Sequence, residues 1–253
     1  MSRLCIALAL LALTAPAAAL DLDLYAEILT RHTSEVDDLA RTRVDYRALT
    51  TSKDWKRLIA SLRAADPARL MTREQRLAFW INSYNVLAID TVVRNYPVDS
   101  IRDVGSFWSP VWKRDAGTIG GDPYTLDQIE HEIIRPMGDP RTHAAVICAS
   151  TSCPALRREP WLAQRLDAQL DVAVRIWMAD PGKGLRIDRA SGTVTLTKIF
   201  DWFDEDFESD GGPLAFAARY ASQNTRVWLG NHRNAQVAYF DYDWTVNDLA
   251  RAR

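Results

Sequence analysis

Hydrophobic positions recur at helical spacing through TREQRLAFWINSYNVLAIDTVVRNYP, residues 72–97. Thr72 and Gln75 have the spacing of a capping box, and a proline closes the segment. The segment is apolar on most sides, so it predicts a buried central helix. Two polar residues, Asn82 and Asn85, interrupt it on one face. Its apolar positions are Leu77, Trp80, Ile81, Tyr84, Leu87 and Ala88.

A second capped helix is predicted by TLDQIEHEIIRP, in which Thr125 and Gln128 form the box. Its apolar stripe, spaced at i, i+3 and i+7, also carries Glu130, while His131 lies on the flank. A carboxylate on a core-facing stripe must be paired, hydrogen-bonded or protonated. Glu130 is therefore expected either to pair with an arginine, such as Arg135 or Arg141, or to act as a general acid.

The remaining pattern divides into short elements. Alternating positions on both sides of a Ser-Gly turn predict a β-hairpin over residues 184–197. Together the elements predict an α+β fold, a helix-rich single domain with a small, mainly antiparallel sheet. The other predicted helices cover residues 22–40, 53–65, 160–180, 198–207 and 213–221, and the other predicted strands cover residues 144–148 and 237–244.

The first residues, MSRLCIALALLALTAPAAAL, have a basic start, an apolar stretch and small residues before a cleavage point. This order is typical of a secretory signal peptide over residues 1–19, with a retained anchor as the alternative. Residues 20–253 then form one domain, exported to the periplasm or secreted, without a further membrane span. The chain has 31 basic and 33 acidic residues and no dense basic block, which argues against nucleic acid as a partner. No cofactor motif is recognised.

Five ordered motifs resemble the DUF547 domain family, of the exported bacterial type. They are AFWINSYNVLAI, YTLDQIEHEIIRP, DPRTHAAVICASTSCPAL, KIFDWFDEDF and YFDYDW-x-x-N, and the resemblance extends over about residues 45–247. The family has no assigned activity, although some relatives join this domain to a glutaredoxin-like domain, which hints at thiol chemistry. Ile147 replaces an asparagine frequent in the family. The matching positions here are Asn82, Asn85, Glu130, His131, His143, Cys148, Ser152, Cys153 and Pro154.

Removal of the signal peptide would leave two cysteines, Cys148 and Cys153. One interpretation is a nucleophilic thiol held by a base. On a straight strand His143 would lie about 16 Å from Cys148, so that pair needs a bend. Cys153 is better placed if Pro154 begins a helix, because the helix dipole lowers the pKa of an N-terminal thiol. The candidate bases are His131 and His143, and the candidate orienters and oxyanion donors are Glu130, Asn82 and Asn85.

The alternative interpretation is structural. Two cysteines with four residues between them in an exported chain commonly pair, with Cα atoms under about 7 Å apart and a stabilisation of about 2 kcal/mol. A third use is metal ligation, but the spacing of these histidines, cysteines and Glu130 matches no tight zinc motif, so no metal site is assigned. Asn82 and Asn85 have a structural alternative as well, as buried hydrogen-bonding residues of the core.

Polar residues recur on the inner faces of both capped helices, beside a His/Cys segment, so we expect them to share a pocket. A central helix before a histidine at a strand start distantly resembles papain-like and transglutaminase-like folds. The sequence thus suggests a thiol-dependent hydrolase or acyl transferase acting on peptide or amide substrates in the cell envelope. The alternative is a disulfide-stapled, non-catalytic module that binds a small peptide or glycan in an aromatic groove of Trp108, Trp112, Trp202 and Trp244.

Overall fold

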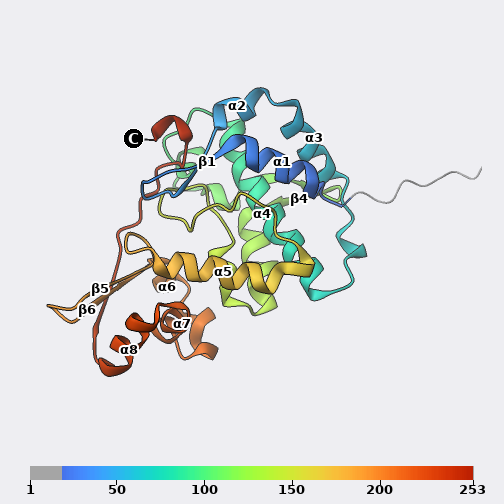
Figure 1. Ribbon diagram of the computed structural model, residues 1–253. Coiled ribbons are helices and arrows are strands. Elements are labelled where there is room, and N and C mark those ends of the chain that lie inside the picture. The colour runs from blue at the N-terminus through green and yellow to red at the C-terminus, as the bar shows by residue number, and fades with distance from the viewer. Residues whose placement is uncertain (1–18, 253) are drawn as a thin grey trace, which may run out of the picture.

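The computed structural model describes residues 19–252, so the predicted signal peptide lies, apart from Ala19, outside the described residues. Figure 1 shows the helices gathered around one long central helix, α4 (Arg73–Arg94). The other α-helices are α1 (Leu22–His32), α2 (Tyr46–Thr51), α3 (Lys53–Arg63), α5 (Leu166–Ala179), α6 (Ile199–Trp202), α7 (Pro213–Tyr220) and α8 (Gln223–Asn231). The strands are β1 (Thr33–Glu35), β2 (Thr42–Val44), β3 (Asp115–Ile119), β4 (Asp122–Thr125), β5 (Leu185–Asp188), β6 (Thr193–Leu196) and β7 (Gln236–Tyr239).

Helix α4 is the core of the fold, as its pattern predicts. The Thr72 hydroxyl accepts the N–H of Gln75, and the Gln75 side chain accepts the N–H of Thr72, both at 3.1 Å. Every residue from 77 to 92 is buried. The helix packs against α2, β3 and the helical segments Gln128–Ile134 and Ala163–Arg165, so it contacts elements from well separated parts of the chain.

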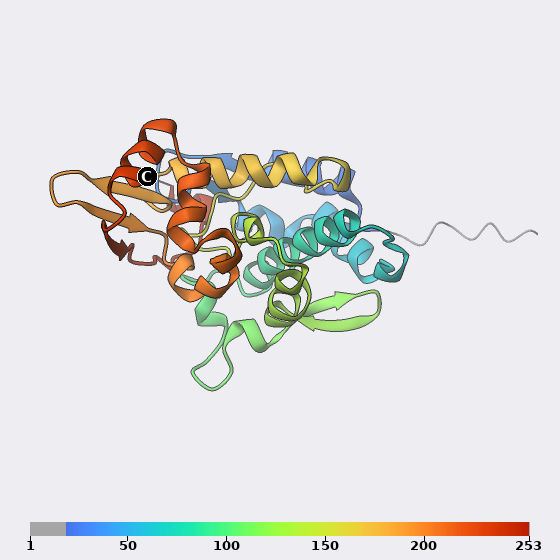
Figure 2. The same ribbon diagram turned by 90° about the horizontal axis from the view of Figure 1, so that it is seen from below.

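The remaining helices cover α4 from two sides. In Figure 1, α1–α3 lie on one side of α4 and α5 crosses the other. Helix α1 ends at His32, earlier than predicted, because Thr33–Glu35 leave the helix and pair antiparallel with β2. Helix α5 begins at Leu166, after a short turn of 3₁₀ helix at Ala163–Arg165. Figure 2 shows the β3–β4 hairpin projecting from the opposite side of the molecule to α5.

The sheets are small and mainly antiparallel, which confirms the predicted α+β class. The β5–β6 hairpin forms where predicted, and β7 adds to β6 in parallel. Strand β7 is shorter than predicted, and the chain after it returns across the molecule. There it forms isolated bridges from Val246 to Ser150 and from Asp248 to Val44. The last segment therefore holds the cysteine loop against the N-terminal part of the domain.

The predicted strand at residues 144–148 is wrong. Pro140–Ala144 form a 3₁₀ helix that Asp139 caps, and an irregular turn follows. A short apolar run does not distinguish a buried strand from a buried helical turn. The expected helix at Pro154 is also absent, since no helical residue occurs from 152 to 162. Cys153 therefore has no helix dipole beside it.

Within residues 19–252, none of the helices combines the length and the apolar character that crossing a membrane requires.

Candidate functional site

The predicted His/Cys segment borders a cavity of about 290 Å³. Its wall comes from α4, the second capped helix, the cysteine loop, the α6 region and the C-terminal segment. The side chains able to do acid, base or nucleophilic chemistry there are Asp127, Glu130, His131, His143, Cys148 and Cys153. Five of the seven residues proposed from the sequence thus meet in one place.

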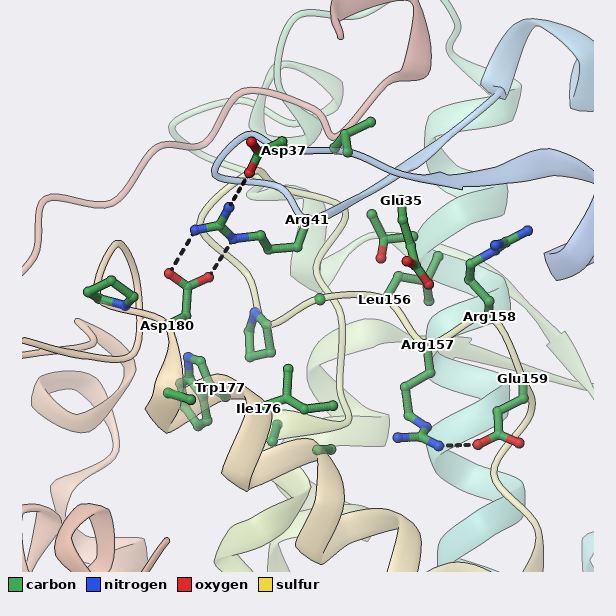
Figure 3. A pocket seen from close by; sticks show the side chains of 18 residues that line it. Glu35, Asp37, Arg41, Leu156, Arg157, Arg158, Glu159, Ile176, Trp177 and Asp180 are labelled. Carbon is green, nitrogen blue, oxygen red and sulfur yellow. Dashed lines mark hydrogen bonds and ion pairs between the residues drawn. The ribbon is translucent and has the colours of Figure 1, made fainter. Parts of the chain in front are cut away.

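A larger hollow of about 1040 Å³ lies on the other side of the cysteine segment. Figure 3 shows two groups of paired charges in it, with Arg41 between Asp37 and Asp180, and Arg157 against Glu159. Neither histidine nor cysteine contributes to its lining among the described residues. We therefore assign the candidate site to the smaller cavity, because the reactive side chains face it.

The second capped helix is a π-helix over Gln128–Ile134 (η4). Its cap forms as predicted, since the Thr125 hydroxyl and the Gln128 side chain each accept the other residue's N–H at 3.0 Å. π-Helical turns are rare and occur frequently at functional sites. This one directs Glu130 and His131 into the cavity. Asp127, which directly precedes the π-helix, also lines the cavity.

Glu130 is held by a tyrosine. The Tyr84 hydroxyl donates to Glu130 Oε2 at 3.0 Å, and burial raises the pKa of Tyr84 well above its ordinary value, so the phenol stays a donor. The expected arginine partner is not found among the described residues, because Arg135 binds Glu205 and Asp206 while Arg141 binds Asp139 and Asp171.

His143 is buried and oriented by a carboxylate. Its Nε2 lies 2.7 Å from Asp206 Oδ2, and its ring packs between Phe203 and Phe207, with centroids 4.7 and 5.4 Å away. Arg135 donates to both oxygens of Asp206, at 2.7 and 2.9 Å. Burial opposes ionisation of Asp206, but the hydrogen bonds from His143 and Arg135 outweigh it and hold the pKa of Asp206 well below its usual range.

The ionised Asp206 fixes the tautomer of His143. A carboxylate only accepts hydrogen bonds, so Nε2 carries a proton, and in the neutral imidazole Nδ1 carries the lone pair. No hydrogen-bond partner for this Nδ1 occurs among residues 19–252. His143 therefore presents a free base nitrogen beside the cavity.

The two cysteines carry free thiols and share one hydroxyl. Cys153 Sγ accepts the N–H of Cys148 at 2.9 Å and the Tyr242 hydroxyl at 3.4 Å. Tyr242 in turn accepts the Ser150 hydroxyl at 3.1 Å and lies 3.2 Å from the Cys148 sulfur. A hydroxyl donates one hydrogen, so the order Ser150 to Tyr242 to Cys153 supplies a donor to each acceptor.

These contacts separate the two thiols in acidity. Burial raises the pKa of Cys153, but the donors from Cys148 and Tyr242 outweigh burial, so the net pKa lies below the ordinary value. For Cys148, burial and the neighbouring Cys153 both raise the pKa. Cys153 is therefore the thiol that ionises first, and Cys148 remains protonated beside it.

The loop that joins the thiols contains a strained residue. Ala149 has a φ of 60°, a left-handed conformation that costs an L-residue roughly 1–2 kcal/mol. Such strain persists where the surroundings over-determine the backbone, and it concentrates at functional sites. Here it turns the chain back, so that Cys153 Sγ reaches the N–H of Cys148.

Asn82 and Asn85 do not line the cavity among the described residues. The Asn85 side chain donates to the carbonyl of Ala145 and accepts the N–H of Ile147, while Asn82 makes the same two bonds to Trp161. Both ends of each amide are occupied, so neither is free as an oxyanion donor. Through these hydrogen bonds the two asparagines hold the segments before and after the cysteine loop against α4.

Aromatic side chains form one wall of the cavity. Trp202 stacks on Trp244 with centroids 5.6 Å apart, Trp112 lies 5.9 Å from Trp244, and Tyr242 packs beside them. The predicted aromatic groove is therefore present for three of its four tryptophans. Trp108 is 90 % exposed, pairs with Phe107, and does not contribute to the lining.

Within residues 19–252 no group of three or more histidine, cysteine, aspartate or glutamate side chains is arranged to hold a metal ion. Disulfide formation between Cys148 and Cys153 stays a prediction, since both thiols are free in the structure.

Three site residues were missed by the sequence reasoning. Asp127 lies at the start of the second capped helix, one position before its first π-helical residue. Asp206 belongs to the acidic face of KIFDWFDEDF, which reads as an ordinary solvated surface, and Tyr242 belongs to the motif YFDYDW near the C-terminus. The only available signal was that all three residues lie in the motifs that resemble the DUF547 family. The roles of Asp206 and Tyr242 depend on contacts across 63 and 89 positions, which no local pattern reports.

The arrangement defines a helix-rich α+β domain with a thiol, a carboxylate-bound histidine and an aromatic wall around one cavity. Residues 68–178 match the family model DUF547, described as a protein of unknown function, so this segment is similar to that family. The predicted resemblance is thereby confirmed for this segment, which holds both cysteines and His143. No curated protein and no solved structure matches the chain.

Proposed function

We propose that this domain is a thiol-dependent hydrolase or acyl transferase, with Cys153 as nucleophile and His143 as general base and acid. The observation that carries the proposal is that an acidified thiol and an aspartate-oriented histidine border the same cavity. Thiolates attack acyl carbons readily, and a histidine held by a carboxylate is the usual partner for the proton transfers.

The proposed reaction has two steps. His143 Nδ1 takes the proton of the Cys153 thiol, and the thiolate forms a bond to the acyl carbon. The C–N bond of the amide then breaks while the imidazolium returns that proton to the leaving amine. Water, or an acceptor amine, then attacks the thioester after giving a proton to His143 Nδ1, and the Cys153 thiolate leaves. The product is a free acid in hydrolysis or a new amide in transfer, and both cysteines end unchanged.

The cavity suits an amine-bearing substrate. Asp127 and Glu130 place carboxylates in its wall, and neither has an arginine or lysine partner among the described residues. Carboxylates attract the ammonium that leaves or enters in amide chemistry. The wall of Trp112, Trp202 and Trp244 offers apolar area for the acyl side. We propose the cell envelope as the location of this activity, on the basis of the signal peptide that the sequence predicts.

The test uses an activated acyl ester of a blocked amino acid as the probe. We expect a hydroxylamine-sensitive adduct that intact-mass and peptide mass spectrometry assign to Cys153. Cys153→Ser should abolish the adduct, and His143→Gln should slow its hydrolysis by about 10²-fold or more. His232→Gln is the matched control, since His232 stacks on Trp228 at the end of α8, away from the cavity. Absence of a Cys153 adduct in protein with titratable thiols would refute the proposal.

The aromatic wall supports a second candidate, a binding module for a peptide or glycan. Trp202 is 41 % exposed beside the cavity, as a stacking platform requires. If this is the function, oligosaccharides or peptides should change the tryptophan fluorescence of Cys153→Ser as much as that of the wild type, and the acyl probe should leave Cys153 unmodified. Turnover of the acyl adduct excludes this candidate.

A further inference from the structure

Lys183 lies directly behind the cysteine loop, in the turn between α5 and β5. It is 3 % exposed, and its ammonium donates to three backbone carbonyls: Cys153 at 2.6 Å, Ala40 at 3.0 Å and Thr151 at 3.3 Å. An ammonium has three N–H donors, so all of them are used. The lysine thus fastens both the cysteine loop and the turn before β2.

Lys183 has no carboxylate partner among residues 19–252. Asp180 acts on it only at longer range, because its oxygens bind Arg41 at 2.8 and 3.1 Å and the N–H of Gly182 at 2.8 Å. Figure 3 shows Arg41 occupying Asp180 in this way. Asp38, the other acid near Lys183, is bound by Arg43 at 2.7 Å.

A buried cation without a counter-charge is costly. Burial accordingly lowers the pKa of Lys183 to about 8, and the negative charge of a Cys153 thiolate is the largest opposing influence. Other charges also reach it, with Asp180 favouring the ammonium and Arg41 opposing it. The ammonium and the thiolate therefore stabilise each other across the Cys153 carbonyl.

The backbone is strained in both segments that the Lys183 ammonium binds, the turn before β2 and the cysteine loop. Arg41 and Ala149 have φ values of 63° and 60°, and within residues 19–252 no other non-glycine residue has a positive φ. Arg41 follows the carbonyl of Ala40, and Ala149 opens the loop that ends with the carbonyl of Cys153. Each strained turn thus presents a carbonyl to the Lys183 ammonium. The two strained residues and the lysine therefore act together to form this contact.

We infer that Lys183 is the positioning residue of the Cys153 nucleophile and the counter-charge of its thiolate. The ammonium holds the loop in the conformation that brings Cys153 Sγ to its donors, and it supplies positive charge on the side away from the cavity. On the cavity side the thiolate faces Cys148 and Tyr242. The inference rests on the proposed function for the role of Cys153, but its test needs no substrate.

The experiment measures the ionisation of Cys153 directly. The full chain is alkylated with iodoacetamide over a range of pH, and peptide mass spectrometry reports Cys153 separately from Cys148. In Lys183→Met we expect the midpoint of Cys153 alkylation to rise by about one pH unit, which slows the reaction about fivefold at pH 7 and about tenfold at lower pH. Lys183→Arg keeps the charge and should stay near the wild-type midpoint. Lys198→Met, at an exposed ion pair with Asp201, is the matched control.

A reciprocal measurement covers the case in which Lys183→Met does not fold. In Cys153→Ser the thiolate is lost, so the pKa of Lys183, followed by NMR of labelled lysine, should fall below that of the wild type. A lysine pKa that is unchanged in Cys153→Ser, or an unchanged Cys153 midpoint in folded Lys183→Met, would reduce Lys183 to a purely structural clamp. Failure of the acyl probe alone would refute the proposed function and leave this inference standing.

Discussion

At the scale of single residues, the chemistry depends on how donors are shared around one sulfur. Cys148 and Cys153 are the same residue type in the same loop, but Cys153 receives the backbone N–H and the phenol, while Cys148 is left beside a negative neighbour. The difference in their pKa values comes from these contacts and not from exposure, because Cys153 is the more buried of the two.

Tyr242→Phe tests this sharing at the phenol. Loss of the hydroxyl removes one donor from the Cys153 thiolate, so we expect alkylation of Cys153 near neutral pH to slow by about threefold or more. Tyr124→Phe is the control, since its hydroxyl has no hydrogen-bond partner within residues 19–252. Equal rates in both variants would show that the backbone N–H alone sets the acidity of Cys153.

At the scale of elements, α4 positions the site without contributing its chemistry. Asn85 binds the backbone of Ala145 and Ile147, within the segment predicted as a strand, and Asn82 binds the backbone of Trp161 after the cysteine loop. Tyr84 of the same helix binds Glu130 of the π-helix, so α4 holds both the π-helix and the segments beside the cysteine loop.

Asn85→Ala should destabilise the protein by about 2 kcal/mol or more, because the buried carbonyl of Ala145 and the N–H of Ile147 lose their partner. Urea unfolding measures this free energy. Asn95→Ala is the matched control at the exposed end of the same helix, where the amide donates only to the Thr91 carbonyl, and a loss under about 1 kcal/mol is expected there. Similar losses of unfolding free energy in the two variants would contradict the role of Asn85 in holding this segment to α4.

Gly184 closes the turn that carries Lys183. A Cβ at this position would lie 1.7 Å from the carbonyl oxygen of Trp177, so Gly184→Ala must displace backbone and should cost about 1–3 kcal/mol. Gly230→Ala, in exposed helix α8 with open space around its Cβ, should instead gain about 0.5–1 kcal/mol. The two midpoints of thermal unfolding should therefore move in opposite directions, and a stabilising Gly184→Ala would show that the turn relaxes freely.

At the scale of the whole molecule, Asp206 joins three distant segments. It binds Arg135 after the π-helix and His143 in the 3₁₀ helix before the cysteine loop, and it lies itself in the helical turn Asp204–Asp210. Its depressed pKa means that it stabilises the fold above the unfolded-state value of about 3.9 and that this stability is lost as pH falls through the folded-state value.

Asp206→Asn should therefore be less stable than the wild type at neutral pH, and its melting temperature should fall less on acidification from about pH 6 to pH 3. Asp23→Asn, an exposed carboxyl in the first turn of α1, should follow the wild-type curve. Parallel curves for wild type and Asp206→Asn would mean that the Asp206 pairs contribute nothing to acid stability.

Much of the fold was predictable because it depends on residues that are close together in the sequence. The capping boxes at Thr72 and Thr125, the buried α4 and the β5–β6 hairpin each depend on residues a few positions apart, and all four are confirmed. The apolar run at 144–148 was misassigned because burial on all sides leaves no periodicity to distinguish strand from turn.

The sequence by itself determined which residue types gather near the cysteines, since Glu130, His131 and His143 lie in motifs with recognisable spacing. Only the tertiary structure decided their roles. In the structure both asparagines bind backbone groups, and Glu130 binds a tyrosine and not an arginine. Asp206 reaches His143 from a distant segment, and Tyr242 and Lys183 reach Cys153 in the same way. The physical reason is that hydrogen-bond partners and charge depend on distance in space, whereas periodicity and capping are set along the chain.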